Sequence, residues 1–245
     1  MNPVFQGVLT LRQRSGWEAA DSGILLWRKS FFYFIPFLVL PMLLFILSRR
    51  LLPAFLQTWF YGILWWFKPF FDHLILGIIS VRFFEPEARI KRLLRGMGRT
   101  LGKGLAGDLL WRRLSPWRSA RMPVRLLEGL RGKKARERLQ DLEGRGLNFG
   151  ILLTSFCLVL EYLLLAGEVI FCVMTLEMFR PGIFSSLTEY TKGLRGLLFF
   201  AYGVNYLLVE SLYVCMGFGL YVNSRIEREG WDLQLLFQGL IPRLK

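Results

Sequence analysis

The feature that most constrains this chain is a central apolar stretch long enough to cross a bilayer as a helix. It is predicted to run from residue 147 to about residue 175, and it overlaps the segment FCLVLEYLLLAGEVIFCVMTLEMF. An α-helix rises about 1.5 Å per residue, so roughly 20 residues cross a hydrocarbon core of about 30 Å. Because the stretch carries Glu161 and Glu168, the fold must supply partners or protons for carboxylates at membrane depth.

Further apolar stretches lie at residues 31–48, 55–84 and about 197–222. Composition agrees with a membrane protein, because 53% of the residues are hydrophobic and the mean hydropathy is +0.39. The second stretch is interrupted at Lys68, and the missing backbone donor of Pro69 predicts a kink or a new helix there. The sequence therefore predicts an all-α integral membrane protein with about four transmembrane helices. The pattern leaves open whether residues 55–67 cross the membrane or lie at its surface.

Residues 85–146 form the largest polar region, and its basic residues outnumber its acidic residues by more than two to one. Cytoplasmic loops of membrane proteins are enriched in Lys and Arg, so this region and both termini are predicted to be cytoplasmic. The predicted parts are an N-terminal amphipathic segment (1–30), two spans (31–84), a basic cytoplasmic region (85–146), two further spans (147–223) and a C-terminal interfacial tail (224–245).

The basic region is predicted to bind anionic lipids rather than nucleic acid. Apolar residues recur at helical spacing at Ile90, Leu94, Met97, Leu101 and Leu105. Arginines and a lysine occupy the other faces, which is typical of a basic amphipathic helix at a membrane surface. Nucleic-acid binding would instead favour an independent soluble fold with interleaved basic and aromatic residues. The net charge of +14 fits attraction to anionic lipid.

Two local patterns predict how the outer helices begin and end. Ser15 and Glu18 have the spacing of a capping box, which predicts a helix that starts there and continues toward the first span. Near the other end, Gly230 can turn the chain into a short helix along the membrane. In this interfacial tail, Trp231 is expected at the lipid headgroups, and Asp232 is expected to cap the helix or contact a basic residue.

Four segments resemble motifs of a family of uncharacterised bacterial multi-spanning inner-membrane proteins. The segments are LRQRSGWEAADSG, WWFKPFFDHLIL, GDLLWRRLSPWRSARMPVRLLEGLRG and ESLYVCMGFGLYVNSRIEREGWDLQLLF. The resemblance implies the bacterial inner membrane as location, and transglutaminase-like membrane proteins or MoxR-type ATPases as partners. It gives weight to the matching charged and aromatic residues Lys68, Asp72, Glu210, Trp231 and Asp232. It defines no activity.

No catalytic centre, cofactor or metal site is predicted. The chain has one histidine, His73, so a two-histidine metal motif is excluded. The three cysteines lie within predicted spans and are expected to be small apolar fillers. The chemistry-bearing residues are instead an intramembrane polar layer, expected from helix spacing to place Glu161 and Glu210 near the second span. The members of this layer are Lys68, Asp72, His73, Glu161, Glu168 and Glu210.

Two functions fit such a layer. A non-catalytic accessory or scaffold subunit would use it as polar contacts between its own helices or with a partner. A small transporter or proton-coupled carrier would use the same groups as a titratable relay. Four spans, no evident internal repeat and a large basic cytoplasmic face favour the accessory subunit, because carriers usually have more spans or a repeat. An unrecognised membrane enzyme is the third alternative.

Overall fold

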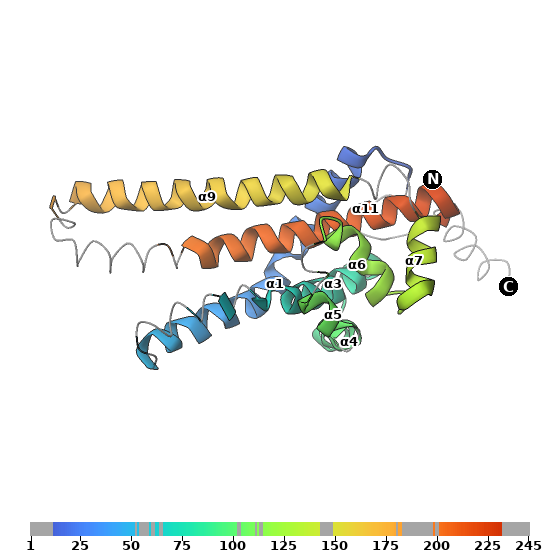
Figure 1. Ribbon diagram of the computed structural model, residues 1–245, viewed down its shortest axis with the longest axis horizontal. Helices are drawn as coiled ribbons and strands as arrows, with labels where there is room; N and C mark the ends of the chain where they lie inside the picture. The colour runs from blue at the N-terminus through green and yellow to red at the C-terminus, as the bar shows by residue number, and fades with distance from the viewer. Residues whose placement is uncertain are drawn as a thin grey trace.

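The computed structural model (Figure 1) is a bundle of helices, and its regular elements are all helical within the described residues. The structure describes residues 12–51, 53, 59, 62–63, 66–101, 104–110, 112, 115–142, 149–179, 181–182, 198 and 201–231, with few of the side chains of residues 37–51. The helices are α1 (Gly16–Leu51), α3 (Lys68–Phe84), α4 (Ile90–Leu101), α5 (Leu105–Leu109), α6 (Arg118–Leu126), α7 (Gly132–Asp141), α9 (Gly150–Phe179), a π-helical turn η2 (Tyr206–Glu210) and α11 (Ser211–Glu229). The prediction of an all-α fold is confirmed for these residues.

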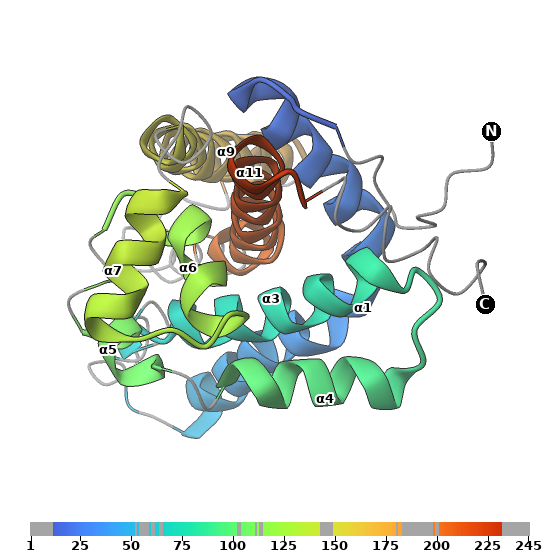
Figure 2. The same cartoon turned by 90° about the vertical axis from the view of Figure 1, so that its right-hand side faces the viewer.

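Within the described residues, two helical segments are long and apolar enough to cross a membrane, α9 and Ala201–Glu229. Their surroundings differ: 6% of the most apolar window of α9 is buried, against 82% for the other segment. Helices α3 to α7 lie together on one side of α11 at one end of the molecule, and we call this group of helices, α11 included, the head. Helix α9 and the far part of α1 extend beyond the head (Figures 1 and 2). The expected total of about four transmembrane helices is not confirmed by length and composition.

Helix α11 packs antiparallel to α1 along a seam of small residues. A Cβ atom on Gly23 would overlap the backbone of Met216, and one on Gly219 would overlap the Ala19 carbonyl oxygen. Farther along the seam, Trp27 Nε1 donates a hydrogen bond to Ser211 Oγ at 2.7 Å. Small residues let two helix backbones approach closely, and α11 thereby becomes the central helix of the bundle.

The paired glycines Gly77 and Gly96 bring α4 directly against α3. A Cβ atom on Gly77 would lie 2.7 Å from the Met97 Cα, and one on Gly96 would lie 2.7 Å from the Gly77 carbonyl oxygen. Thr100 Oγ1 donates to the His73 carbonyl oxygen at 2.6 Å, which extends the contact. Glycines in this region thus serve close packing against a neighbouring helix.

The face of α4 that packs on α3 differs from the apolar face predicted for the basic helix. Met97 is buried on α3 as an inward residue, whereas Ile90 and Leu94 are 70% and 51% exposed. The predicted helix is also shorter, because α4 ends at Leu101 and Gly104 has a positive φ of 78° before α5 begins. Close glycine contact, rather than the apolar stripe alone, selects the face of α4 that is buried.

The break expected at Lys68 coincides with the start of α3. Phe67 forms a turn, and Pro69 occupies the first turn of the helix, where its missing donor costs no hydrogen bond. Helix α3 has 17 residues, of which 13 are buried, so protein surrounds it on most sides. Most of residues 55–67, whose membrane placement the sequence left open, lie outside the described residues.

The predicted helix start and tail turn are both present. Helix α1 begins at Gly16 and runs unbroken to Leu51, and the Glu18 amide donates to Ser15 Oγ at 3.3 Å. Helix α11 ends at Gly230, which has a φ of 60°. Trp231 packs against protein, since the residue is 9% exposed and its ring centroid lies 6.2 Å from that of Phe83. Its expected place at the lipid headgroups stays a prediction.

Replacing Gly96 by alanine is expected to lower the free energy of unfolding by about 1 to 3 kcal/mol, because the new methyl group meets the fixed Gly77 carbonyl oxygen. Gly98→Ala is the matched control on the same helix, since a Cβ there has nothing within 4 Å. The control should be neutral or stabilise by up to about 1 kcal/mol through helix propensity. Thermal unfolding of both purified variants measures the difference, and equal destabilisation would contradict the packing.

Candidate functional site

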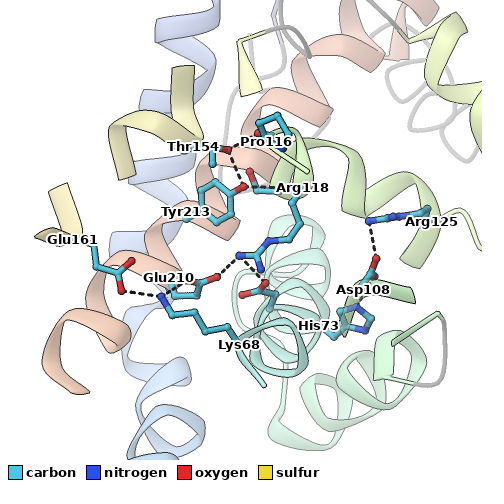
Figure 3. Close-up of polar contacts among 12 residues, drawn as sticks. Lys68, His73, Asp108, Pro116, Arg118, Arg125, Thr154, Glu161, Glu210 and Tyr213 are labelled. Atoms are coloured by element: carbon cyan, nitrogen blue, oxygen red, sulfur yellow. Dashed lines mark hydrogen bonds and ion pairs between the residues drawn. The ribbon is translucent and has the colours of Figure 1, made fainter. Parts of the chain in front are cut away.

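Five charged side chains meet where α3, α6, α9 and the π-helical turn converge (Figure 3). We call them the charged cluster: Lys68, Asp72, Arg118, Glu161 and Glu210. All are buried or nearly so, with side chains between 1% and 16% exposed. Charges with so little access to water require partners, so the contacts within the cluster decide whether this junction is stable.

Glu210 is the bridge of the charged cluster. Its Oε2 lies 3.2 Å from Lys68 Nζ, and its Oε1 lies 2.5 Å from Arg118 Nη2. Lys68 Nζ also donates to Glu161 Oε1 at 2.8 Å, and Arg118 Nη2 lies 3.3 Å from Asp72 Oδ2. The result is a continuous chain of ion pairs that joins four segments distant in the sequence.

Local helix geometry brings these groups together. Lys68 is the first residue of α3, and Asp72 follows one turn later on the same face. Glu210 is the last residue of η2, where the wider π-helical turn shifts side chains relative to a regular α-helix. The carboxylates of Glu161 and Glu210 meet Lys68 at the N-terminus of α3, where the helix dipole also favours negative charge.

The charged cluster contains three carboxyl groups and two cations. If all five were ionised, the buried group would carry one excess negative charge, which a site with little water disfavours. One proton makes it neutral. Asp72 is the natural position for that proton, because its side chain is 1% exposed and, among the described residues, Arg118 is its one ion-pair partner.

Arg118 is the member that sequence reasoning missed. It belongs to the basic region, which was assigned to the cytoplasm, yet its side chain is 11% exposed. Burial by itself lowers the pKa of Arg118, but Asp72 and Glu210 outweigh this and raise it above its ordinary range. The excess of carboxyl groups over Lys68 in the predicted layer was the available signal that a further cation had to enter it.

Tyrosines surround the two cations. Lys68 Nζ lies 5.4 Å from the ring centroid of Tyr206, and the Arg118 guanidinium lies 5.4 Å from that of Tyr213. These distances suit cation–π contact. The Tyr213 hydroxyl is 2.9 Å from Thr154 Oγ1, which ties this shell to α9. Aromatic faces and carboxylates together replace the water that the cations lose.

A cavity of about 460 Å³ lies over the charged cluster, between α9 and the segment leading into α11. Lys68, Arg118, Glu161 and Glu210 line it, and Asp72 does not. Its other lining residues are Ser115, Pro116, Thr154, Ser155, Cys157, Leu158, Tyr162, Leu165, Tyr202, Asn205, Val209 and Tyr213. The volume falls within the range of small-ligand sites.

His73 does not join the charged cluster, although the sequence predicted it at the same depth. Its ring is fully buried on another side of α3, with Nε2 3.0 Å from Asp108 Oδ2 (Figure 3). Nδ1 lies 3.2 Å from the Thr100 carbonyl oxygen, so Nδ1 carries a hydrogen, and a second proton lies between Nε2 and Asp108. Arg125 Nη2 is 3.1 Å from Asp108 Oδ1, and burial lowers the pKa of Arg125. This second cluster binds α5 and α6 to α3.

The remaining predicted residues are dispersed. Glu168 lies on α9 outside the cavity lining, and its Oε2 has no hydrogen-bond partner within the described part of the chain. Trp231 lies beside Phe83. The guanidinium carbon of Arg225 lies over the Trp231 ring, 4.2 Å from the ring centroid. Asp232 lies outside the described residues.

Comparison with known proteins assigns no family or function to this chain. Comparison with protein-family models, characterised proteins and solved structures found no match to this chain. Within the described residues, no group of three histidine, cysteine or acidic side chains is arranged to hold a metal ion. The cavity and the charged cluster are therefore interpreted from their own chemistry.

Replacing Arg118 by glutamine is expected to lower the free energy of unfolding by about 3 to 5 kcal/mol, because Glu210 loses a buried counter-ion. Asp72→Asn should change it by less than about 1 kcal/mol, since a neutral group replaces the carboxyl assigned the proton.

Combining the two substitutions should cost about as much as Arg118→Gln alone, since a protonated Asp72 carries no charge that its replacement would remove. Denaturant titration of the four proteins measures these differences. A large loss in Asp72→Asn alone would show that Asp72 is ionised and that the charge assignment is wrong.

Proposed function

We propose that this protein is a non-catalytic accessory or scaffold subunit of a complex in the bacterial inner membrane. The observation that carries the proposal is the ion pairing of the charged cluster. Lys68, Arg118 and Glu210 hold one another at 2.5 to 3.2 Å across α3, α6 and η2. Groups paired in this way stabilise a particular arrangement of helices, as polar contacts between membrane helices do.

The membrane placement that we propose differs from the one expected from the sequence, which put the residues of α3 in a membrane span. Helix α4 lies along α3 and exposes Arg92, Arg95 and Arg99. Guanidinium groups on that surface are costly in hydrocarbon, so the head belongs on the cytoplasmic side, near anionic lipid headgroups. The far parts of α1 and α9 extend away from it and suit the bilayer (Figure 1). The charged cluster then lies near the boundary between head and membrane.

Helix α9 offers the surface for a partner subunit. It is apolar on all sides, and Leu163, Phe171 and Met174 are 65% to 70% exposed. A carboxyl group on such a helix is costly beside lipid tails. Glu168 is partly buried, and its Oε2 is covered within the chain without a hydrogen-bond partner among the described residues. A polar side chain on a helix of another membrane protein would pair with this carboxyl group from its uncovered side. Transglutaminase-like membrane proteins and MoxR-type ATPase complexes are the partners to test first.

Glu168→Leu is expected to reduce recovery of a partner by about threefold to tenfold, the effect of losing one hydrogen bond between membrane helices. Its folding should be unchanged, since Glu168 Oε2 has no hydrogen bond to lose within the described residues. Purification of the tagged chain in mild detergent, followed by mass spectrometry of co-purifying proteins, measures recovery.

Thr175→Leu is the matched polar-to-apolar control on α9, because the Thr175 hydroxyl is already satisfied by the Phe171 carbonyl oxygen at 2.7 Å. It should recover the partner as well as the unmodified chain. Recovery of this chain alone across several detergents would count against the accessory role.

Reporter fusions test the topology. A fusion after Ser119 and fusions at both termini are expected to report the cytoplasm, because the basic region should not be translocated. Fusions near Leu52 and Ser186 are expected to report the periplasm. A periplasmic signal after Ser119 would reverse the head and overturn the placement.

A small proton-coupled carrier is the second candidate, and the cavity over Lys68, Glu161 and Glu210 favours it. The two functions differ for Glu161→Gln, because Lys68 keeps Glu210 as its counter-ion in this variant. As a structural contact, Glu161→Gln should keep stability and partner recovery, since an amide retains hydrogen bonding to Lys68. In a carrier it would fold but lose transport, because the titrating group is gone. Thermal unfolding, partner recovery and proton uptake by proteoliposomes, measured on the same preparation, separate the two.

A further inference from the structure

We propose that the cavity over the charged cluster binds the zwitterionic headgroup of an aminophospholipid, with its primary ammonium group on Glu161. The proposal rests on the membrane placement given above and on no partner protein. It concerns a lipid held between helices of this chain, and is separate from the general attraction of a basic surface for anionic lipid.

The position of the cavity matches the depth of lipid headgroups. Its lining on α9 extends from Thr154 to Leu165, a length of about 16 Å at the rise of an α-helix. The end near Thr154 adjoins Ser115 and Pro116 of the head, and the other end adjoins the part of α9 that extends from it. A molecule in the cavity would therefore have its polar end at the head and its apolar end toward the bilayer.

The cavity opens beside exposed residues of α9. Leu158 and Tyr162 line the cavity, yet they are 49% and 70% exposed. An opening beside such residues admits a lipid sideways, with its headgroup inside and its acyl chains in hydrocarbon. Tyr162 also suits this depth, because tyrosine is enriched at membrane interfaces.

The charges that line the cavity suit a zwitterion. Lys68 and Arg118 supply two cations, and Glu161 and Glu210 supply two carboxylates. A lone anion would meet both carboxylates, and a lone cation would meet both basic groups. A headgroup with a phosphate and an ammonium can pair with each sign. Glu161 is the more accessible carboxylate, since its side chain is 16% exposed against 6% for Glu210.

Asn205 supplies independent evidence for a ligand. It lines the cavity and is fully buried, but neither its amide nitrogen nor its oxygen has a hydrogen-bond partner in the described residues. A buried amide without partners is destabilising, whereas a bound phosphate or glycerol oxygen would accept from its nitrogen. Asn205 immediately precedes η2, and π-helical turns occur frequently at functional sites.

Binding of three short-chain phospholipids to the detergent-solubilised full chain tests the proposal. Phosphatidylethanolamine and phosphatidylcholine have the same charges and tails, but the methylated ammonium of phosphatidylcholine has no N–H to donate. Native mass spectrometry should show phosphatidylethanolamine bound about tenfold more tightly, the effect of one charge-assisted hydrogen bond. Phosphatidylglycerol should also bind more weakly. Equal affinity for the two zwitterionic lipids, or a preference for phosphatidylglycerol, would overturn the proposal.

Three variants assign the preference to the cavity. Glu161→Gln should abolish the preference for phosphatidylethanolamine, and Asn205→Leu should weaken binding of this lipid without loss of thermal stability. Glu168→Gln, on the same helix but outside the cavity, should bind as the unmodified chain does. If Glu161→Gln keeps the full preference, the ammonium does not contact Glu161 and the assignment is wrong.

Free phosphoethanolamine distinguishes the source of the headgroup. If it displaces the lipid at similar concentration, the cavity recognises the zwitterion itself and a soluble ligand is the occupant. If it does not compete, the apolar part of the lipid is required, as the sideways mouth implies. Partner recovery is a separate measurement, so loss of lipid preference with intact recovery would reject this inference and leave the accessory function standing.

Discussion

The arrangement of the helices depends on the contact of Glu210 with two cations. Lys68 and Arg118 come from opposite sides of the predicted cytoplasmic boundary, and Glu210 lies between them at 3.2 and 2.5 Å. With so little water present, each charge is stable only while the others remain in place. The positions of α3, α6 and η2 are therefore coupled, and the junction defines where the head meets the extended helices.

Besides the ion pairs, close contacts at glycines hold the helices together. The seam between α1 and α11 and the docking of α4 on α3 both bring backbones to distances that a side chain at Gly23 or Gly96 would prevent. Arg82 joins the same assembly, since its Nη2 donates to the Lys29 carbonyl oxygen at 2.8 Å. The head is thus a packed helical unit built around α11, whereas α9 contributes one face to it and leaves the rest uncovered.

The accessory role and the lipid site concern neighbouring parts of α9. The accessory role uses the uncovered part of the helix, and the lipid site uses its junction with the head. Glu168 lies partly buried on α9, with a covered Oε2 that has no partner in the described residues, and its uncovered side is assigned to contact with another subunit. Glu161 lines the cavity on the same helix as Leu158 and Tyr162, which lie at its mouth. A lipid bound there would contact both the head and α9, so the junction could respond to the surrounding membrane while a partner occupies the outer helix.

The sequence by itself determined the helical class, the starts of α1 and α3, the turn at Gly230 and most of the charged cluster. These follow from local chemistry: a serine cap, a proline, a glycine with positive φ, and carboxylates that cannot remain unpaired among apolar residues. Tertiary structure alone decided that Arg118 enters the cluster, that His73 turns to Asp108, and that Trp231 is covered. Periodicity gives the depth and face of a side chain on its own helix, but it carries no information about which distant helix covers that face. That choice depends on how closely the backbones approach at glycines and on which buried charges find partners across the chain.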